Sequence, residues 1–153
     1  MTPVDAALEH LGKELDLTLK LSPQGTLQLR LRGGLSLNFE ADGEATIHAY
    51  TVLAAYLSDS QQARFFPAML EAQLFGAETG DARFGLDASR QELVLHQRFD
   101  MRRTELADLS ASLEQFLSVA KRWTDRLSSP TDSEVGTQPL QSDVSHAGPW
   151  LRA

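Results

Sequence analysis

The chain has 153 residues, a net charge of −7 and no cysteine, and its pI is about 5.0. This length fits one domain with a tail, and the negative charge argues against binding to nucleic acid or anionic membranes, because no cationic surplus exists to displace counterions from phosphates. The lack of cysteine excludes disulfides, thiolate metal sites and a cysteine nucleophile. No secretory signal is predicted near the N-terminus, and the longest apolar run, 52–57, is far shorter than the ~20 residues of a membrane helix. We therefore expect a cytoplasmic protein without membrane insertion.

The N-terminal third changes from helical to strand-like periodicity. Apolar residues at helical spacing predict an amphipathic helix over 4–15, with Pro3 suited to its first turn. Strict alternation of apolar and polar residues follows in the segments 17–21, 27–31, 35–39 and 45–53. Such alternation is typical of an antiparallel sheet with one packed face and one solvated face.

The central and C-terminal parts add two helices and a hairpin. A helix is predicted over 60–75, capped by Asp59 with Gln62 as the reciprocal partner. Because Pro67 lies within it, this helix either kinks there or begins near Phe66. Alternating apolar residues predict a second hairpin with strands over 83–87 and 92–100. A continuous apolar stripe predicts the longest helix over 104–127.

The resulting order is α-β-β-β-α-β-β-α, which defines an α+β fold with a twisted antiparallel sheet packed by helices. This domain covers residues 1–127. Ser, Thr, Asp, Gln, Gly and Pro dominate residues 128–153, and this composition predicts a disordered tail in which only Trp150-Leu151 could dock.

No pattern in the sequence indicates catalysis. The four histidines are scattered without metal-ligand spacing, and the glycines at 76 and 80 bracket a turn that lacks the lysine of a phosphate loop. Most of the 21 carboxylates fall on polar faces or in turns, whereas general acid–base catalysis needs a cleft that shifts their pKa values. We therefore predict no enzyme, no metal and no cofactor. A small enzyme or ligand-binding domain is the last-ranked hypothesis, because it would require a deep pocket with convergent polar groups.

Apolar surface is the feature that remains to be explained. Nine large apolar residues lie between positions 17 and 39. Most of them are expected to pack on the helices, but a sheet has edges, and leucines left open would form a surface for a partner. A free strand edge can also accept a peptide as an added strand.

The segment 69–87 resembles the central signature of the class I type III secretion chaperones, the Tir-chaperone family. Gln73 stands where the family usually has asparagine. The matching positions in that segment are Leu70, Ala72, Leu74, Thr79-Gly80, Ala82 and Leu86-Asp87. Upstream, 25–31 and 35–40 resemble the first hairpin of the family, and downstream 92–101 and 113–123 resemble its next strand and last helix. The resemblance covers about residues 4–127.

This resemblance implies a cytoplasmic bacterial homodimer that uses no cofactor. Such proteins bind the N-terminal segment of a cognate secreted effector in extended form and keep it soluble and ready for export, with secretion-apparatus components as further partners. The implied effector-binding residues are Leu8, Leu11, Leu27 and Leu29, and the implied dimer interface comprises Leu70, Leu74, Phe75, Phe84 and Leu86. Plain core packing is the alternative for each residue. The alternative function is a regulatory interaction module of the same fold that binds a folded partner.

Overall fold

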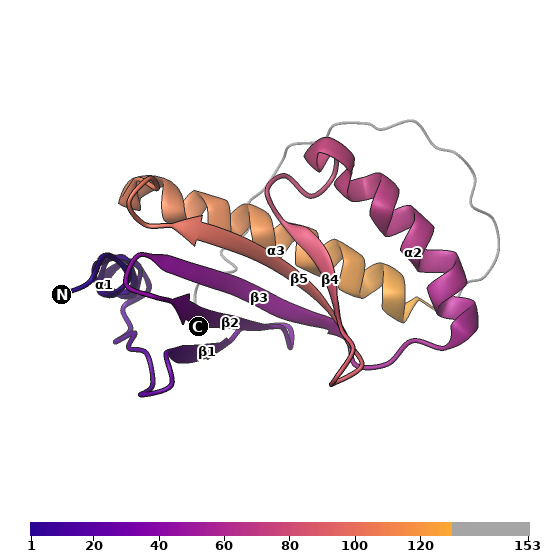
Figure 1. The fold of residues 1–153 in the computed structure, drawn as a ribbon, viewed down its shortest axis with the longest axis horizontal. Coiled ribbons are helices and arrows are strands. Elements are labelled where there is room, and N and C mark those ends of the chain that lie inside the picture. Colours follow the sequence, from indigo (N-terminus) through magenta and orange to yellow (C-terminus); the bar gives the residue numbers. More distant parts are fainter. Residues whose placement is uncertain (130–153) are drawn as a thin grey trace.

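The structure is a computed structural model that describes residues 1–129 (Figure 1). Its elements are α1 (Pro3–Leu15), β1 (Thr26–Arg30), β2 (Ser36–Asp42), β3 (Thr46–Ala54), α2 (Asp59–Gln73), the 3-10 turn η1 (Leu74–Gly76), β4 (Arg83–Asp87), β5 (Glu92–Asp100) and α3 (Leu106–Ser128). This order confirms the predicted α-β-β-β-α-β-β-α arrangement. The predicted tail, with Trp150, lies outside the described residues except for its first two positions.

The five strands form one antiparallel sheet in the order β1-β2-β3-β5-β4. The strands β3 and β5 are therefore central, and β1 and β4 are the two edges. Along β3 the burial alternates, with Ile47, Ala49, Thr51 and Leu53 buried. That face packs on α3, which also contacts α1, as the side-by-side course of α3 and the sheet in Figure 1 illustrates.

The hydrophobic core lies between the sheet and the helices α1 and α3. Leu37, Leu95 and Leu113 are fully buried, and Trp123 and Phe116 of α3 are each 1% exposed. The Trp123 ring meets the Phe84 ring edge-on, with centroids 4.9 Å apart. The apolar stripe predicted for the last helix thus packs on the sheet, and through Trp123 it also contacts β4, which is paired with β5.

Helix α1 ends in a tight reversal that the sequence did not reveal. The Thr2 hydroxyl accepts the Asp5 N–H, and the Asp5 carboxylate accepts the Thr2 N–H, which forms a capping box at the start of the helix. Asp16, at the other end, has a φ of 55°, and the Leu17 N–H donates to the Gly12 carbonyl at 2.9 Å. A Cβ at residue 12 would lie 2.5 Å from the Leu17 oxygen. Only glycine permits this approach.

The prediction of strand-like structure for 17–21 is wrong. The segment leaves α1 extended but belongs to no strand. It packs back over α1 because of the reversal at Gly12, so Leu19 and Leu21 reach the core from outside the sheet. Alternation alone cannot distinguish an extended connection from a paired strand, since both place successive side chains on opposite sides.

Helix α2 begins one residue earlier than predicted and ends two residues earlier. Its N-cap is Ser58, which forms a capping box with Gln61, whereas Asp59 and Gln62 were expected to fill these roles. The Gln62 amide instead donates to the Leu57 carbonyl at 2.9 Å. Pro67 lies inside a helix that runs continuously from residue 59 to residue 73, so the helix does not start near Phe66.

Candidate binding surfaces

Large exposed apolar side chains gather at one end of the molecule. Phe75 is 99% exposed, Leu70 is 64% exposed, and Leu74 and Leu86 are each 59% exposed. These four residues, on α2, η1 and β4, form what we call the α2–β4 patch. They are four of the five positions predicted for a dimer interface. The fifth, Phe84, is partly buried and packs on Trp123 within the same chain.

A shallow hollow of about 170 Å³ opens within the α2–β4 patch. Its lining is almost entirely apolar and consists of Phe66, Met69, Leu70, Gln73, Phe84, Gly85, Leu86 and Leu93. Gln73 is the polar exception, and its side-chain oxygen accepts the backbone N–H of Phe84 at 2.9 Å. Because this N–H points away from β5, Gln73 closes one hydrogen-bonding position on the free edge of β4.

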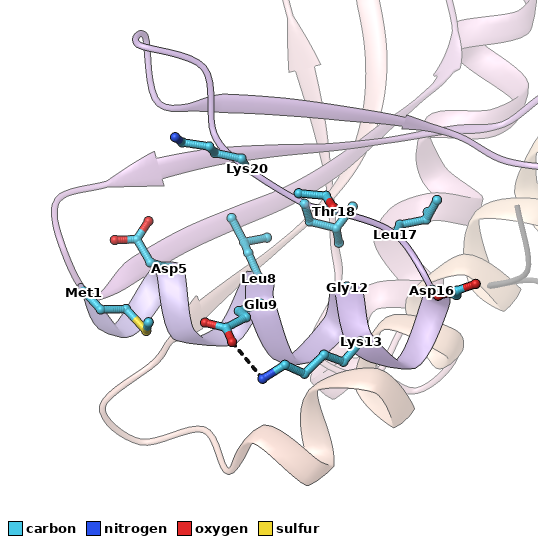
Figure 2. A pocket seen from close by; sticks show the side chains of 11 residues that line it. Met1, Asp5, Leu8, Glu9, Gly12, Lys13, Asp16, Leu17, Thr18 and Lys20 are labelled. Atoms are coloured by element: carbon cyan, nitrogen blue, oxygen red, sulfur yellow. Dashed lines mark ion pairs between the residues drawn. The ribbon is translucent and has the colours of Figure 1, made fainter.

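A second surface lies at the other end of the long axis, beside α1 (Figures 1 and 2). A groove of about 670 Å³ runs between α1 and the returning segment 16–20. Leu8 projects from α1 toward that segment, and the rim carries the ion pair between Glu9 and Lys13, whose oxygen and nitrogen are 2.7 Å apart (Figure 2). Leu17, 39% exposed, contributes apolar surface to the groove. We call this the α1 groove.

A broad depression of about 700 Å³, which shares Lys20 with the α1 groove, lies between residues 20–22 and the strands β1 to β3. Its floor carries a polar ladder in which the Gln28 amide donates to Asn38 Oδ1 at 2.8 Å, and Asn38 Nδ2 donates to the Tyr50 carbonyl at 3.3 Å. Leu21, Leu27 and Phe39 supply its apolar surface.

The backbone along this depression is unpaired on two sides. The Leu31 N–H donates to the Leu35 carbonyl, and the Ala41 N–H donates to the Gly25 carbonyl. In an antiparallel pair, every second residue of a strand bonds to its partner strand and the residues between them point the other way. Gln28 and Arg30 occupy such intervening positions, so their N–H and C=O groups point away from β2. Within residues 1–129, the segment 18–21 makes no backbone–backbone hydrogen bond. Two extended stretches therefore present free backbone groups next to hollows lined by both polar and apolar side chains.

The residues predicted to bind a client are not all accessible. Leu8 is 3% exposed and Leu11 is 1% exposed, because both lie on the face of α1 that packs into the core. Leu27 and Leu29 are partly buried against the same core. The structure brings Leu8 and Leu27 to the walls of the two adjoining hollows and leaves Leu11 out of both.

Sequence reasoning missed the residues that shape these surfaces. Gly12 stands out in the sequence as a lone glycine inside a helical pattern. Its reason, the close return of the chain over α1, is visible only in the structure. Gln73 was noted only as a departure from asparagine, and its bond to the edge of β4 depends on how α2 lies against the sheet.

The open face of the sheet carries His96, whose pKa lies below its ordinary value. Burial lowers the pKa of His96, and the nearby His48 and Arg83 lower this pKa further. No group of three or more His, Asp or Glu side chains in residues 1–129 could hold a metal ion. No helix in that part of the chain is long and apolar enough to cross a membrane.

The element order, the five-stranded antiparallel sheet and the exposed side chains define the class of protein, a small α+β domain with exposed apolar surfaces. The particular family follows from the sequence. Residues 6–124 match the model of the Tir chaperone protein (CesT) family, and the chain belongs to this family. Among curated proteins, no sequence matches this chain.

Solved structures share the fold at low sequence identity. One chain of the HopA1–SchA chaperone–effector complex is 15% identical with a TM-score of 0.66, over 80% of this chain and 94% of that chain. One chain of the heterodimeric ExoU–SpcU complex of the Pseudomonas aeruginosa type III secretion system is 18% identical with a TM-score of 0.66, over 81% and 98%. One chain of the complex between the Yersinia pestis type III secretion chaperone SycH and a YscM2 fragment is 18% identical with a TM-score of 0.60, over 78% and 98%.

Proposed function

We propose that this protein is a cytoplasmic type III secretion chaperone that binds the N-terminal segment of a secreted effector in extended form. In this proposal it acts as a homodimer and keeps the effector soluble and ready for export. Membership of the chaperone family supports this function, and structural neighbours include chaperone–effector complexes. We assign the protein no catalytic reaction.

The observation that carries the mode of binding is the pair of unpaired backbone stretches beside hollows that contain exposed leucine side chains. An extended polypeptide that lies along β1 would find free N–H and C=O groups at Gln28 and Arg30. Main-chain pairing supplies affinity without demanding a particular sequence, and alternate side chains of the client would contact the leucines that line the two hollows. Leu21 and Leu27 line the depression, and Leu17 lines the α1 groove.

This assignment modifies the role expected for the first helix. Leu8 and Leu11 hold α1 against the sheet, and in our proposal they support the groove from beneath. The accessible client contacts come instead from the segment that returns over α1 and from β1. This follows from burial, since a side chain that is 1–3% exposed offers a partner almost no surface.

The second part of the proposal is that the α2–β4 patch forms the homodimer interface. Its four leading residues are largely exposed in one chain, and contiguous apolar patches on soluble proteins usually mark interaction sites. Replacing Leu74, 59% exposed, by Asp should weaken dimerisation without loss of folding. Unchanged mass in light scattering at micromolar concentration would refute this assignment.

A proline placed at the free edge tests the client site. The Arg30 N–H points away from β2, so Arg30→Pro removes an edge donor while the β1–β2 bonds remain. Arg30→Ala is the matched control, because it removes only the side chain. We expect Arg30→Pro to lose capture of the N-terminal segment of the protein encoded beside this one, and Arg30→Ala to retain it, in a co-expression pull-down.

Two outcomes would contradict the mode of binding. Equal capture by the proline and alanine variants would show that the client does not pair with β1. Capture that depends on a folded domain of the partner, and not on its N-terminal segment, would favour the alternative of a regulatory module. An extended segment of ~50–100 residues would bury well above the ~1,600 Å² of a standard interface.

A further inference from the structure

Phe75 combines exposure with an unusual backbone conformation. Its side chain is 99% exposed, and its φ of 53° and ψ of 21° lie in the left-handed region. Residues with a Cβ rarely adopt this conformation, and those that do are mostly asparagine, aspartate or histidine. Gly76, which follows, has a φ of 72°. Neither local conformational preference nor packing within the chain accounts for a phenylalanine at this position.

A hollow with room for such a side chain lies on the same surface. The hollow of the α2–β4 patch has about 170 Å³ of free volume and apolar walls. One of its walls is Phe66, in the middle of α2, whereas Phe75 projects from the turn after the C-terminal end of the helix. One chain therefore carries both a projecting ring and a hollow for a ring.

We propose that Phe75 of each copy inserts into the hollow of a second copy, so that two reciprocal insertions fix the register of the homodimer. This inference rests on the proposed homodimer and names the residue that determines its geometry. In a twofold-symmetric dimer the same patch of both copies forms the interface. Each contact therefore occurs twice, once from the first copy to the second and once in the reverse direction. If two α2 helices cross antiparallel near Leu70, position 75 of one copy faces positions 65–66 of the other, where the hollow has its Phe66 wall.

A second copy fits this surface better than an extended client does. An extended client needs free backbone groups, and on β4 the Phe84 N–H already donates to Gln73. The client site proposed above lies at the opposite end of the molecule (Figure 1). The α2–β4 patch thus offers side-chain packing and a partly closed strand edge, which suits a folded partner with the same shape.

Engineered cysteines test the pairing directly, because the natural chain has none. Leu86 lines the hollow and is 59% exposed, so Leu86→Cys should leave the fold intact. The double variant Phe75→Cys/Leu86→Cys should form a covalent dimer on mild oxidation. The control Phe75→Cys/Leu17→Cys should not, since Leu17 lies beside α1. Phe75→Cys alone should not do so either.

A second variant measures the contribution of the ring. Asparagine tolerates the left-handed conformation, so Phe75→Asn should fold while its dimer dissociation constant rises about 100-fold or more, because two buried rings are lost per dimer. Leu17→Asn, the control, should keep the parent constant. A dimer in light scattering that neither cross-links through 75 and 86 nor weakens with Phe75→Asn would overturn this inference and leave the homodimer standing. A parent protein that is monomeric at micromolar concentration would overturn both.

Discussion

Gly12→Ala should destabilise the protein, although glycine-to-alanine changes inside helices normally do the opposite. In an exposed helix interior the exchange gains about 1 kcal/mol. Here the added Cβ would lie 2.5 Å from the Leu17 carbonyl oxygen and 3.4 Å from the Leu19 nitrogen. Both atoms belong to the backbone, so no side-chain rotation can relieve the contact.

The size of the effect follows from these two opposing contributions. Inserting a group into a close-packed site costs typically about 1–3 kcal/mol, and a contact with backbone belongs at the upper end of that range. Subtracting the helix-propensity gain of about 1 kcal/mol leaves a net loss of about 2 kcal/mol. The segment 16–20 should also move away from α1, which would widen the α1 groove.

Urea unfolding at a fixed protein concentration measures this loss, since the stability of a dimer depends on concentration. Lys13→Ala is the control in the same helical turn. The Lys13 side chain is 73% exposed and its ion pair with Glu9 lies at the surface, so its removal should change the unfolding free energy by less than about 0.5 kcal/mol. If Gly12→Ala proves as stable as the parent, or more so, the close approach of Leu17 to α1 is refuted.

The remaining predictions concern the core, the sheet surface and a helix start. Thr51 is fully buried and its hydroxyl has no hydrogen-bond partner, so Thr51→Val should raise the unfolding free energy by about 1 kcal/mol; a loss in the same urea assay would contradict this. Because the folded state lowers the pKa of His96, chiefly through burial and then through His48 and Arg83, the unfolded chain binds its proton more readily. Stability should therefore fall as the pH drops through about 6.5 toward the lowered value, and His96→Gln should flatten that slope in thermal melts at pH 5 to 8. Ser58→Ala removes the hydroxyl that accepts the Gln61 N–H at the start of α2 and should cost about 1 kcal/mol; no change in urea unfolding would show that this cap is dispensable.

The strands were predictable because their periodicity is local. The hairpin bounds 83–87 and 92–100 agree with β4 and β5, since turn residues separate two short alternating segments. The longest helix also agrees to within two residues at its start, because its apolar stripe continues through Trp123. The prediction for segment 17–21 was wrong for the opposite reason. Its position depends on a contact with Gly12, which the periodicity of the sequence does not indicate.

The candidate surfaces were predictable only in part. The apolar side chains of the α2–β4 patch are exposed because no neighbouring helix or strand covers them. A sequence does not show which elements become neighbours in the fold, so it cannot show which apolar side chains stay exposed. Phe84 and Leu86 illustrate the difference. They are two residues apart on one strand, yet Phe84 packs on Trp123 while Leu86 stays 59% exposed.

The two edges of the sheet differ in one respect that bears on function. At β4, Gln73 occupies the Phe84 N–H, so a strand added there would lose one of its backbone bonds. At β1, Gln28 and Arg30 have their outward backbone groups free. A protein that must hold an extended client and also pair with itself needs these two tasks kept apart, because an open edge at both ends would allow copies to add to one another strand by strand. In the function proposed above, closing the β4 edge with the Gln73 side chain would direct self-association to side-chain packing and reserve main-chain pairing for the client.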